Sequence, residues 1–261
     1  MSKIIAVNGP PGSGKTTLAL NLAKEIHEKT RKKVLYISPD TMIPAMGLIF
    51  ARREKDSLYS LGKALENVNL AYTDFLGVTH TTKAMPNLGF VGYAPRENSH
   101  SYAEVKENKV VQMYQILRDN FDFVVLDCDR NREDLISAIG CGLSDHVVQI
   151  INPDIKTIAY YGGEPMSDRA VLVLNMLDND IYLPIQDMKS KFPDIQFMIP
   201  YNRAAKLQMC EGTLMDLLKD PVYRKSIKPL VELLVKEPEP EEEQPKEEEP
   251  LLDEKSEDFW R

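Results

Sequence analysis

Short runs of apolar, often β-branched residues recur along the chain and are typical of buried parallel strands. They lie at residues 3–8, 34–37, 88–94, 123–126, 146–151, 171–175 and 195–199. Apolar residues at helical spacing predict helices over 16–29, 41–50, 58–65, 102–119, 132–139, 214–218 and 222–235. Strands that alternate with helices predict an α/β fold, namely a doubly wound, mostly parallel sheet of about seven strands with helices on both faces. Residues 72–87 show no clear period.

The net charge of the chain differs before and after residue 235. The 261 residues include 32 basic and 40 acidic side chains, a net charge of −8. Twelve acidic and four basic residues lie in 236–261, so this tail carries the whole imbalance and the body is neutral. A neutral body gives no general electrostatic argument for binding nucleic acid, although a local basic patch stays open. We expect one domain over 1–235 and a disordered, Glu/Pro-rich tail over 236–261.

Other bulk features narrow the class of protein. No stretch reaches the ~18 apolar residues of a membrane span, and the first residues lack the pattern of a secretory signal. Cys128, Cys141 and Cys210 have no paired spacing, which predicts neither a disulfide framework nor a zinc site and suits the cytoplasm. Cys128 is interpreted as inert packing beside a strand.

The most specific motif lies between the first predicted strand and the first predicted helix, and reads Gly9-Pro10-Pro11-Gly12-Ser13-Gly14-Lys15-Thr16. It fits the phosphate-loop pattern G-x-x-x-x-G-K-[ST] in full and in the required context. The glycines let the backbone curl, so that N–H groups from Gly9 through Ser13 to Thr17 can point at phosphate oxygens. Lys15 is expected to reach the phosphates of ATP or ADP, and Thr16 to bind Mg²⁺. The alternative is a plain glycine-rich turn.

Two acids follow predicted strands. Asp127 ends the run Phe123-Val124-Val125-Leu126-Asp127, which predicts a second Mg²⁺ ligand, although it could be an ordinary strand-end acid. Asp40 follows the run at 34–37, a strand expected beside the phosphate loop. It could orient an attacking or metal-bound water, or equally cap a helix or stabilise a turn. Arg130 and Arg132 could sense a γ-phosphate, but arginines at such places are more often solvated.

Along the chain, the phosphate loop is followed by the strand before Asp40 and then by the strand that ends at Asp127. These three elements resemble the ParA/MinD group of P-loop ATPases over most of residues 1–235, with CpaE/TadZ-like pilus-assembly or conjugation ATPases as the nearest type. The resemblance implies that Asn175, in Val171-Leu172-Val173-Leu174-Asn175, contacts adenine and that Pro200, Tyr201 and Asn202 border it. From the residues alone, Asn175 would be a strand-end turn former. The resemblance also implies a homodimer. Pro10 stands where the family's signature lysine reaches the partner's nucleotide, so that contact is missing here.

The sequence therefore predicts Mg-ATP binding and slow hydrolysis with Lys15, Asp40 and Asp127 as catalytic residues, in a nucleotide-dependent switch. The resemblance favours a role in a pilus, secretion or conjugation assembly, with recruitment to the membrane by partners. Three alternatives stay open. They are a partition ATPase, a small-molecule or nucleotide kinase, and a scaffold that binds nucleotide without hydrolysis. Against the kinase, Arg169 is the one arginine in 155–190, where a lid would be expected.

The acidic tail ends in a motif of its own. Leu252 and Phe259 are seven residues apart and would share one helix face, and Trp260 is the chain's one tryptophan. This pattern predicts a short linear motif for a protein partner, and the alternative is a solubilising tail. Its negative charge is the wrong sign for an anionic membrane, so direct membrane insertion is not expected.

Overall fold

The computed structural model describes residues 2–51, 59–129, 131, 133–163, 169–178, 180 and 183–237. The strands in these ranges are β1 (Lys3–Asn8), β2 (Val34–Ser38), β3 (His80–Thr82), β4 (Met85–Gly92), β5 (Phe123–Asp127), β6 (His146–Ile151), β7 (Ala170–Leu177) and β8 (Ile195–Pro200). The helices are α1 (Lys15–Thr30), α2 (Ala45–Ile49), α3 (Leu61–Leu65), α4 (Tyr72–Val78), α5 (Glu107–Asn120), α6 (Leu135–Leu143), α7 (Ile155–Gly162), α8 (Ile185–Lys191), α9 (Arg203–Glu211) and α10 (Pro221–Val235).

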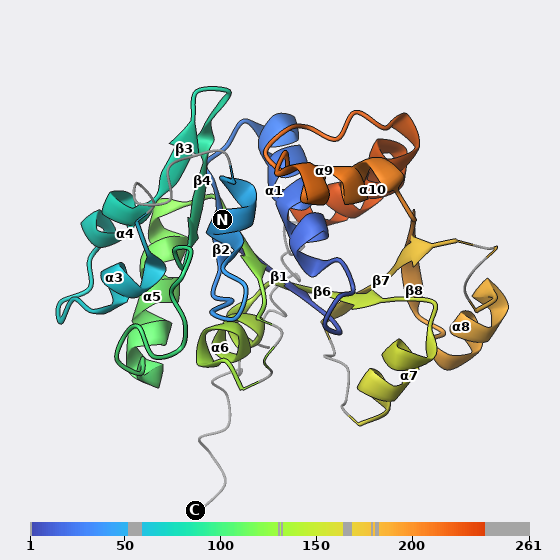
Figure 1. Ribbon diagram of the computed structural model, residues 1–261, viewed down its shortest axis with the longest axis horizontal. Helices are drawn as coiled ribbons and strands as arrows, with labels where there is room; N and C mark the ends of the chain where they lie inside the picture. The colour runs from blue at the N-terminus through green and yellow to red at the C-terminus, as the bar shows by residue number, and fades with distance from the viewer. Residues whose placement is uncertain are drawn as a thin grey trace, which may run out of the picture.

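The strands form one sheet in the order β3-β4-β2-β5-β1-β6-β7-β8 (Figure 1). Every neighbouring pair is parallel except β3 and β4. The predicted α/β fold with a mostly parallel sheet is confirmed. The sheet has eight strands because the stretch 72–87, where no period was visible, forms α4, the short edge strand β3 and the start of β4.

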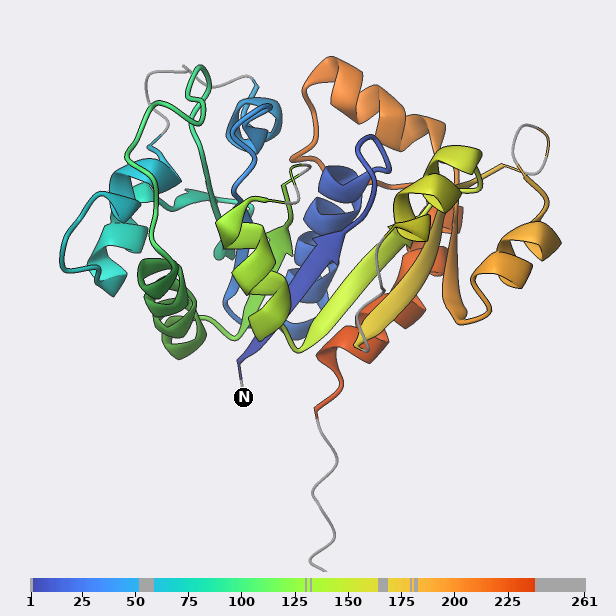
Figure 2. The ribbon, with the colours of Figure 1, turned by 90° about the horizontal axis from the view of Figure 1, so that it is seen from below.

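Helices cover both faces of the sheet (Figures 1 and 2). Because side chains alternate along a strand, Ile5 and Val7 of β1 join the core under α1 and α10, while Ile4 and Ala6 join the core under α5 and α6. This alternation of fully apolar positions is what a strand buried on both faces requires. Among the described residues, no helix has the length and apolar character needed to cross a membrane.

The helices predicted over 41–50, 58–65 and 102–119 all begin later than their apolar periods suggested. The helix predicted over 41–50 is reduced to α2, because the Asp40 carboxylate accepts hydrogen bonds from the N–H groups of Met42 and Ile43 and holds a turn there. The helix predicted over 102–119 begins only at Glu107. Tyr102 belongs instead to a loop that packs against Gly62, where an added methyl carbon would lie 2.2 Å from its ring.

One predicted helix is wrong, and three helices besides α4 were missed. Residues 214–218 form a turn, although Leu214 and Leu218 are buried in the core as their spacing suggested. The missed helices α7, α8 and α9 each bury a single residue of their own, namely Thr157, Met188 and Ala205. All three are short, with seven to nine residues, so each offers too few positions for a helical period to be recognised.

Strand order corrects one further prediction. The strand that precedes Asp40 does not lie beside the strand of the phosphate loop, because β5 lies between β2 and β1. In register, Val7 of β1 is paired with Asp127 of β5, and Ile37 of β2 with Leu126. All three strands run parallel, so their carboxyl ends meet at one edge of the sheet.

Candidate functional site

The phosphate loop joins β1 to α1 in a conformation that only glycine adopts without strain. Gly12 and Gly14 have φ angles of 80° and 89°, in the left-handed region. A methyl carbon added at Gly14 would also lie 2.8 Å from the side chains of Asn175 and Met176. The loop therefore turns tightly enough to direct the start of α1 at the space above it, where the first N–H groups of a helix attract anions.

Lys15 begins α1 and folds back over the loop. Its ammonium donates hydrogen bonds to the carbonyl oxygens of Gly9, at 3.0 Å, and Pro10, at 3.4 Å. The first turn of α1 contains no acidic side chain. The positive end of the helix and the lysine therefore act on the same point, which is the arrangement that binds a phosphate.

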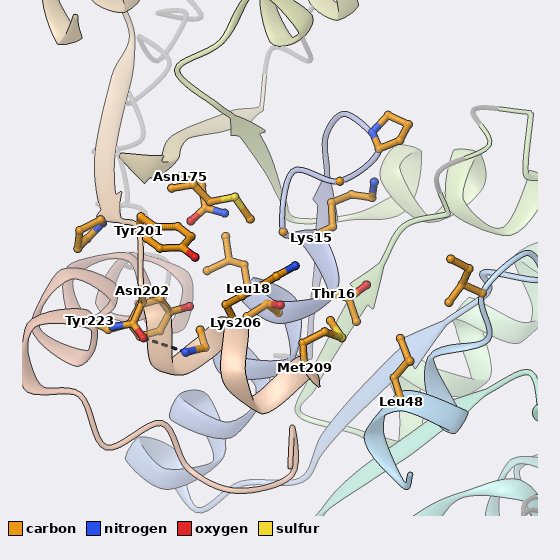
Figure 3. A pocket seen from close by; sticks show the side chains of 18 of the residues that line it. Lys15, Thr16, Leu18, Leu48, Asn175, Tyr201, Asn202, Lys206, Met209 and Tyr223 are labelled. Carbon is orange, nitrogen blue, oxygen red and sulfur yellow. Dashed lines mark hydrogen bonds between the residues drawn. The ribbon is translucent and has the colours of Figure 1, made fainter. Parts of the chain in front are cut away.

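A cavity of about 450 Å³ opens over this loop. Figure 3 shows Lys15 and Thr16 on one side of it and Asn175 and Tyr201 on the opposite side. The sequence-predicted residues that line it are Gly12, Gly14, Lys15, Thr16, Thr17, Asp40, Asn175, Pro200, Tyr201 and Asn202. Its volume lies in the range of small-molecule sites, roughly 300–1,000 Å³.

Asp127 lies at the end of β5, next to the strand that feeds the phosphate loop. Its side chain is 2% exposed and does not line the cavity, whereas Thr16 and Cys128 beside it do. One carboxylate oxygen accepts a hydrogen bond of 2.7 Å from the Tyr36 hydroxyl and a longer one from Ser38. The other oxygen, Oδ1, is buried and accepts no hydrogen bond from the residues that the structure describes.

Burial raises the pKa of Asp127 to about 6. The hydrogen bond from Tyr36, the nearby Thr16 hydroxyl and the charge of Lys15 oppose that rise, and the charge of Asp40 adds to it. A buried carboxylate with one unpartnered oxygen, beside a threonine hydroxyl, fits a hard divalent cation. Within the described ranges no group of three or more His, Cys, Asp or Glu could hold a metal alone. Mg²⁺ usually binds through one or two carboxylates together with phosphate oxygens.

Asp40 lies in the same cavity as predicted, but its carboxylate also has a structural role. Oδ1 accepts hydrogen bonds of 2.9 and 2.8 Å from the N–H groups of Met42 and Ile43. The turn-residue interpretation is therefore confirmed, and the water-orienting role stays a prediction.

Asn175 contacts the phosphate loop itself. Its amide nitrogen donates a hydrogen bond of 2.8 Å to the carbonyl oxygen of Ser13, a residue that is 2% exposed. Asn152, which sequence reasoning missed, donates weaker bonds to Ser13 and to the backbone of Asn175. Asn175 thus ties β7 to the loop, and its predicted contact with adenine stays a prediction.

Sequence reasoning also missed several residues of the site. Tyr36 supplies the hydrogen bond to Asp127, and α9 and α10 bring Lys206, Met209 and Tyr223 to the cavity (Figure 3). Tyr36 lies within the strand predicted over 34–37, and nothing in its sequence context marks its hydroxyl as part of a site. The α9 residues gave no signal because their helix was itself missed. Arg130, Arg132 and residues 238–261 of the predicted tail lie outside the described residues.

A complete phosphate loop between β1 and α1 of a doubly wound sheet defines a P-loop protein. The family model described as "AAA domain" matches residues 1–182, which is more than half of the chain, so the chain belongs to this family. No curated protein matches the sequence.

Solved structures match over nearly their whole lengths. A ParA family ATPase from Chlorobium tepidum is 13% identical with a TM-score of 0.73, over 88% of this chain and 97% of that one. The MinD cell division protein of Aquifex aeolicus is 17% identical with a TM-score of 0.69, over 92% and 99%. MinD of Pyrococcus horikoshii, complexed with Mg-ADP, is 18% identical with a TM-score of 0.68, over 90% and 97%. The chain has the fold of the ParA/MinD ATPases.

Proposed function

We propose that this protein binds Mg-ATP, hydrolyses it slowly and acts as a nucleotide-dependent switch on a larger assembly. One observation carries the proposal: the phosphate loop with Lys15 and Thr16 lies against Asp127, whose buried Oδ1 has no hydrogen-bond partner among the described residues. That arrangement offers a cradle for phosphates and an oxygen ligand for a cation within one site. The Mg-ADP found in the similarly folded Pyrococcus MinD supports the same ligand here.

Different residues of the site bind the phosphates, hold Mg²⁺ and orient the attacking water. N–H groups at the start of α1 and the Lys15 ammonium bind the phosphates and stabilise charge as it develops on the γ-phosphate. Thr16 and Asp127 would hold Mg²⁺, which would neutralise phosphate charge. The Asp40 carboxylate, which lines the cavity, orients the attacking water.

The base lies on the opposite side of the cavity. Asn175 uses one amide N–H on Ser13, so its second N–H and its carbonyl oxygen are available to adenine. Pro200 and Tyr201 border the base, and Tyr201 is 43% exposed, as a residue on the rim of the cavity would be. These assignments rest on the placement of the residues around one cavity.

As a switch, the protein acts on partners. We favour a pilus, secretion or conjugation assembly of the CpaE/TadZ type, with the tail at 236–261 as a docking motif for a protein partner. A homodimer that lacks the contact removed by Pro10 is also part of the proposal. The ParA and MinD names of similarly folded proteins keep partition or cell-division roles open.

A second candidate is a scaffold that binds nucleotide without hydrolysing it. It is favoured by Asp40, whose Oδ1 is occupied by two backbone N–H groups and is thereby held in a structural role. The kinase alternative has little support, because the guanidinium of Arg169 donates to the carbonyl oxygens of Ser144 and Gly142. Arg169 directly precedes β7, so it lies at the amino ends of the strands, away from the carboxyl ends where the cavity opens, and is poorly placed to close over a substrate.

Calorimetric titration of the full chain with ATP, with and without Mg²⁺, tests the proposal. Lys15→Ala is expected to weaken binding at least about tenfold, because it removes a charge-assisted contact. Asp127→Asn is expected to abolish the gain in affinity that Mg²⁺ gives. Asp134→Asn is the matched control, since Asp134 is another largely buried acid with a raised pKa, but it caps α6 and does not line the cavity. Unchanged binding in Lys15→Ala would refute the proposal.

A further inference from the structure

Two cysteines that are separate in sequence meet beside the candidate site. The sulfur atoms of Cys128 and Cys141 lie 3.5 Å apart. Cys128 directly follows Asp127 and is 3% exposed, whereas Cys141 lies on α6 and is partly exposed. Cys210, the third cysteine, is exposed on α9 and is not part of this pair.

The contact follows from how closely α6 packs on the sheet. Gly140 faces β5, and a methyl carbon added there would lie 2.2 Å from the Tyr114 hydroxyl and 2.4 Å from the Leu126 side chain. Any larger residue would push the helix outward. The missing side chain at Gly140 therefore brings the next residue, Cys141, against the end of β5, where Cys128 lies.

We propose that Cys128 and Cys141 form a reversible redox modification site, in which a disulfide locks the end of β5 to α6. The sulfurs need to approach by about 1.5 Å to reach the bonding distance of ~2.05 Å, a movement that side-chain rotation and a small helix shift can supply. Disulfides in reducing compartments are usually transient and regulatory, which suits a pair of this kind.

The chemistry balances with hydrogen peroxide as the oxidant. Cys141 is the more accessible sulfur, so it attacks one peroxide oxygen; the O–O bond breaks, and a sulfenic acid and one water form. The sulfur of Cys128 then attacks the sulfenic sulfur, the S–S bond forms, and the hydroxyl leaves as a second water. The two thiols lose two electrons and two protons in total, and both protons end in water. A small dithiol reverses the reaction by thiol–disulfide exchange.

The modification reaches the nucleotide site because Cys128 is the residue after Asp127 and itself lines the cavity. Its N–H donates to Val7 on β1, so the segment is fixed to the sheet on one side and free to be tied to α6 on the other. This consequence rests on the proposed function: oxidation shifts Asp127 and is expected to weaken Mg-ATP binding at least about threefold.

Mapping of thiols and disulfides in the full-length chain tests the site without reference to nucleotide. After dilute peroxide, alkylation and digestion, the expected product joins the peptides of Cys128 and Cys141, forms equally in Cys210→Ser, and disappears on treatment with dithiothreitol. Alkylation of both cysteines after peroxide, or Cys210-linked dimers as the sole product, would overturn the proposal. This readout keeps both Cys128 and Cys141 in place, so it does not depend on whether a variant of either cysteine folds.

A second measurement separates the site from its effect. The ATP affinity of oxidised and reduced protein is compared in Cys210→Ser, with Cys141→Ser as the variant that cannot close the bond. A mapped disulfide with unchanged affinity would refute the coupling, while loss of ATP binding in both redox states would instead refute the proposed function.

Discussion

Replacing Asp127 by asparagine damages the candidate site, yet it should make the ligand-free protein more stable relative to wild type. This advantage in unfolding free energy should grow as pH rises. Burial raises the pKa of this carboxyl from 3.8 to about 6 in the folded protein. A group whose folded pKa lies above its unfolded pKa binds more protons when folded, so wild-type stability falls as pH rises between those two values. The full loss is about 3 kcal/mol, at ~1.36 kcal/mol for each pKa unit.

The assay is urea unfolding followed by circular dichroism, without Mg²⁺ or nucleotide, at pH 4.5 and 7.5. The difference in unfolding free energy between Asp127→Asn and wild type should grow by about 2 kcal/mol across this window, which covers most of the titration. Asparagine also alters the hydrogen bond from Tyr36 and the local packing. These effects on the unfolding free energy are the same at both pH values, so they cancel when the two differences are subtracted. Other acids, including Asp134, cancel because they titrate alike in both proteins.

Asp134→Asn is the matched control for the link to ligand binding. Burial also raises the pKa of Asp134 to about 6, so this variant should show a change of the same sign. It should be smaller, because Asp134 is more exposed to solvent screening. Only Asp127→Asn should also lose the stabilisation that Mg-ATP gives. A difference that stays constant between pH 4.5 and 7.5 for Asp127→Asn would show that this carboxylate carries no burial penalty, and the reasoning would fail.

Three further substitutions test other parts of the structure. Gly14→Ala forces a left-handed φ of 89° and a contact with Asn175, so we expect a loss of ~1–3 kcal/mol in urea unfolding and no detectable ATP binding; a stable variant that binds ATP would contradict this. Gly140→Ala drives a methyl group into Tyr114, so urea unfolding should show a loss of ~1–3 kcal/mol in the free energy of unfolding. An unchanged unfolding midpoint would mean that α6 packs less closely on the sheet. Lys206→Ala removes a cation from the cavity wall and should weaken ATP binding roughly two- to fivefold by calorimetry, with identical affinity as the contrary result.

The phosphate loop and Asp127 could be predicted from the sequence because each depends on one continuous segment of the chain. A phosphate loop is one continuous segment, and its glycines, lysine and threonine are fixed by backbone geometry within a single turn. Asp127 could be predicted because four apolar residues ending in an acid mark the end of a buried strand. The same reasoning gave the strands β1, β5 and β6 nearly residue for residue.

The remaining parts depend on contacts between distant segments. Strand order is set by how helices cross over the sheet, so the position of β5 between β1 and β2 was not visible in the sequence. Cys128 and Cys141 show no paired spacing, and only the close packing of α6 brings them together. For Asp40, the sequence left open a role in orienting water and a role in stabilising a turn. The structure shows the turn, and the role in orienting water stays a prediction.

The most direct test of the proposed switch is phosphate release by the full-length chain with ATP and Mg²⁺ over many turnovers. We expect a slow rate that needs Mg²⁺ and is lost in both Lys15→Ala and Asp127→Asn, while Asp134→Asn retains it. A rate at background in the wild-type chain, despite tight Mg-ATP binding, would contradict hydrolysis and favour the scaffold. A rate that survives Lys15→Ala would mean that the phosphate loop is not the site of the reaction.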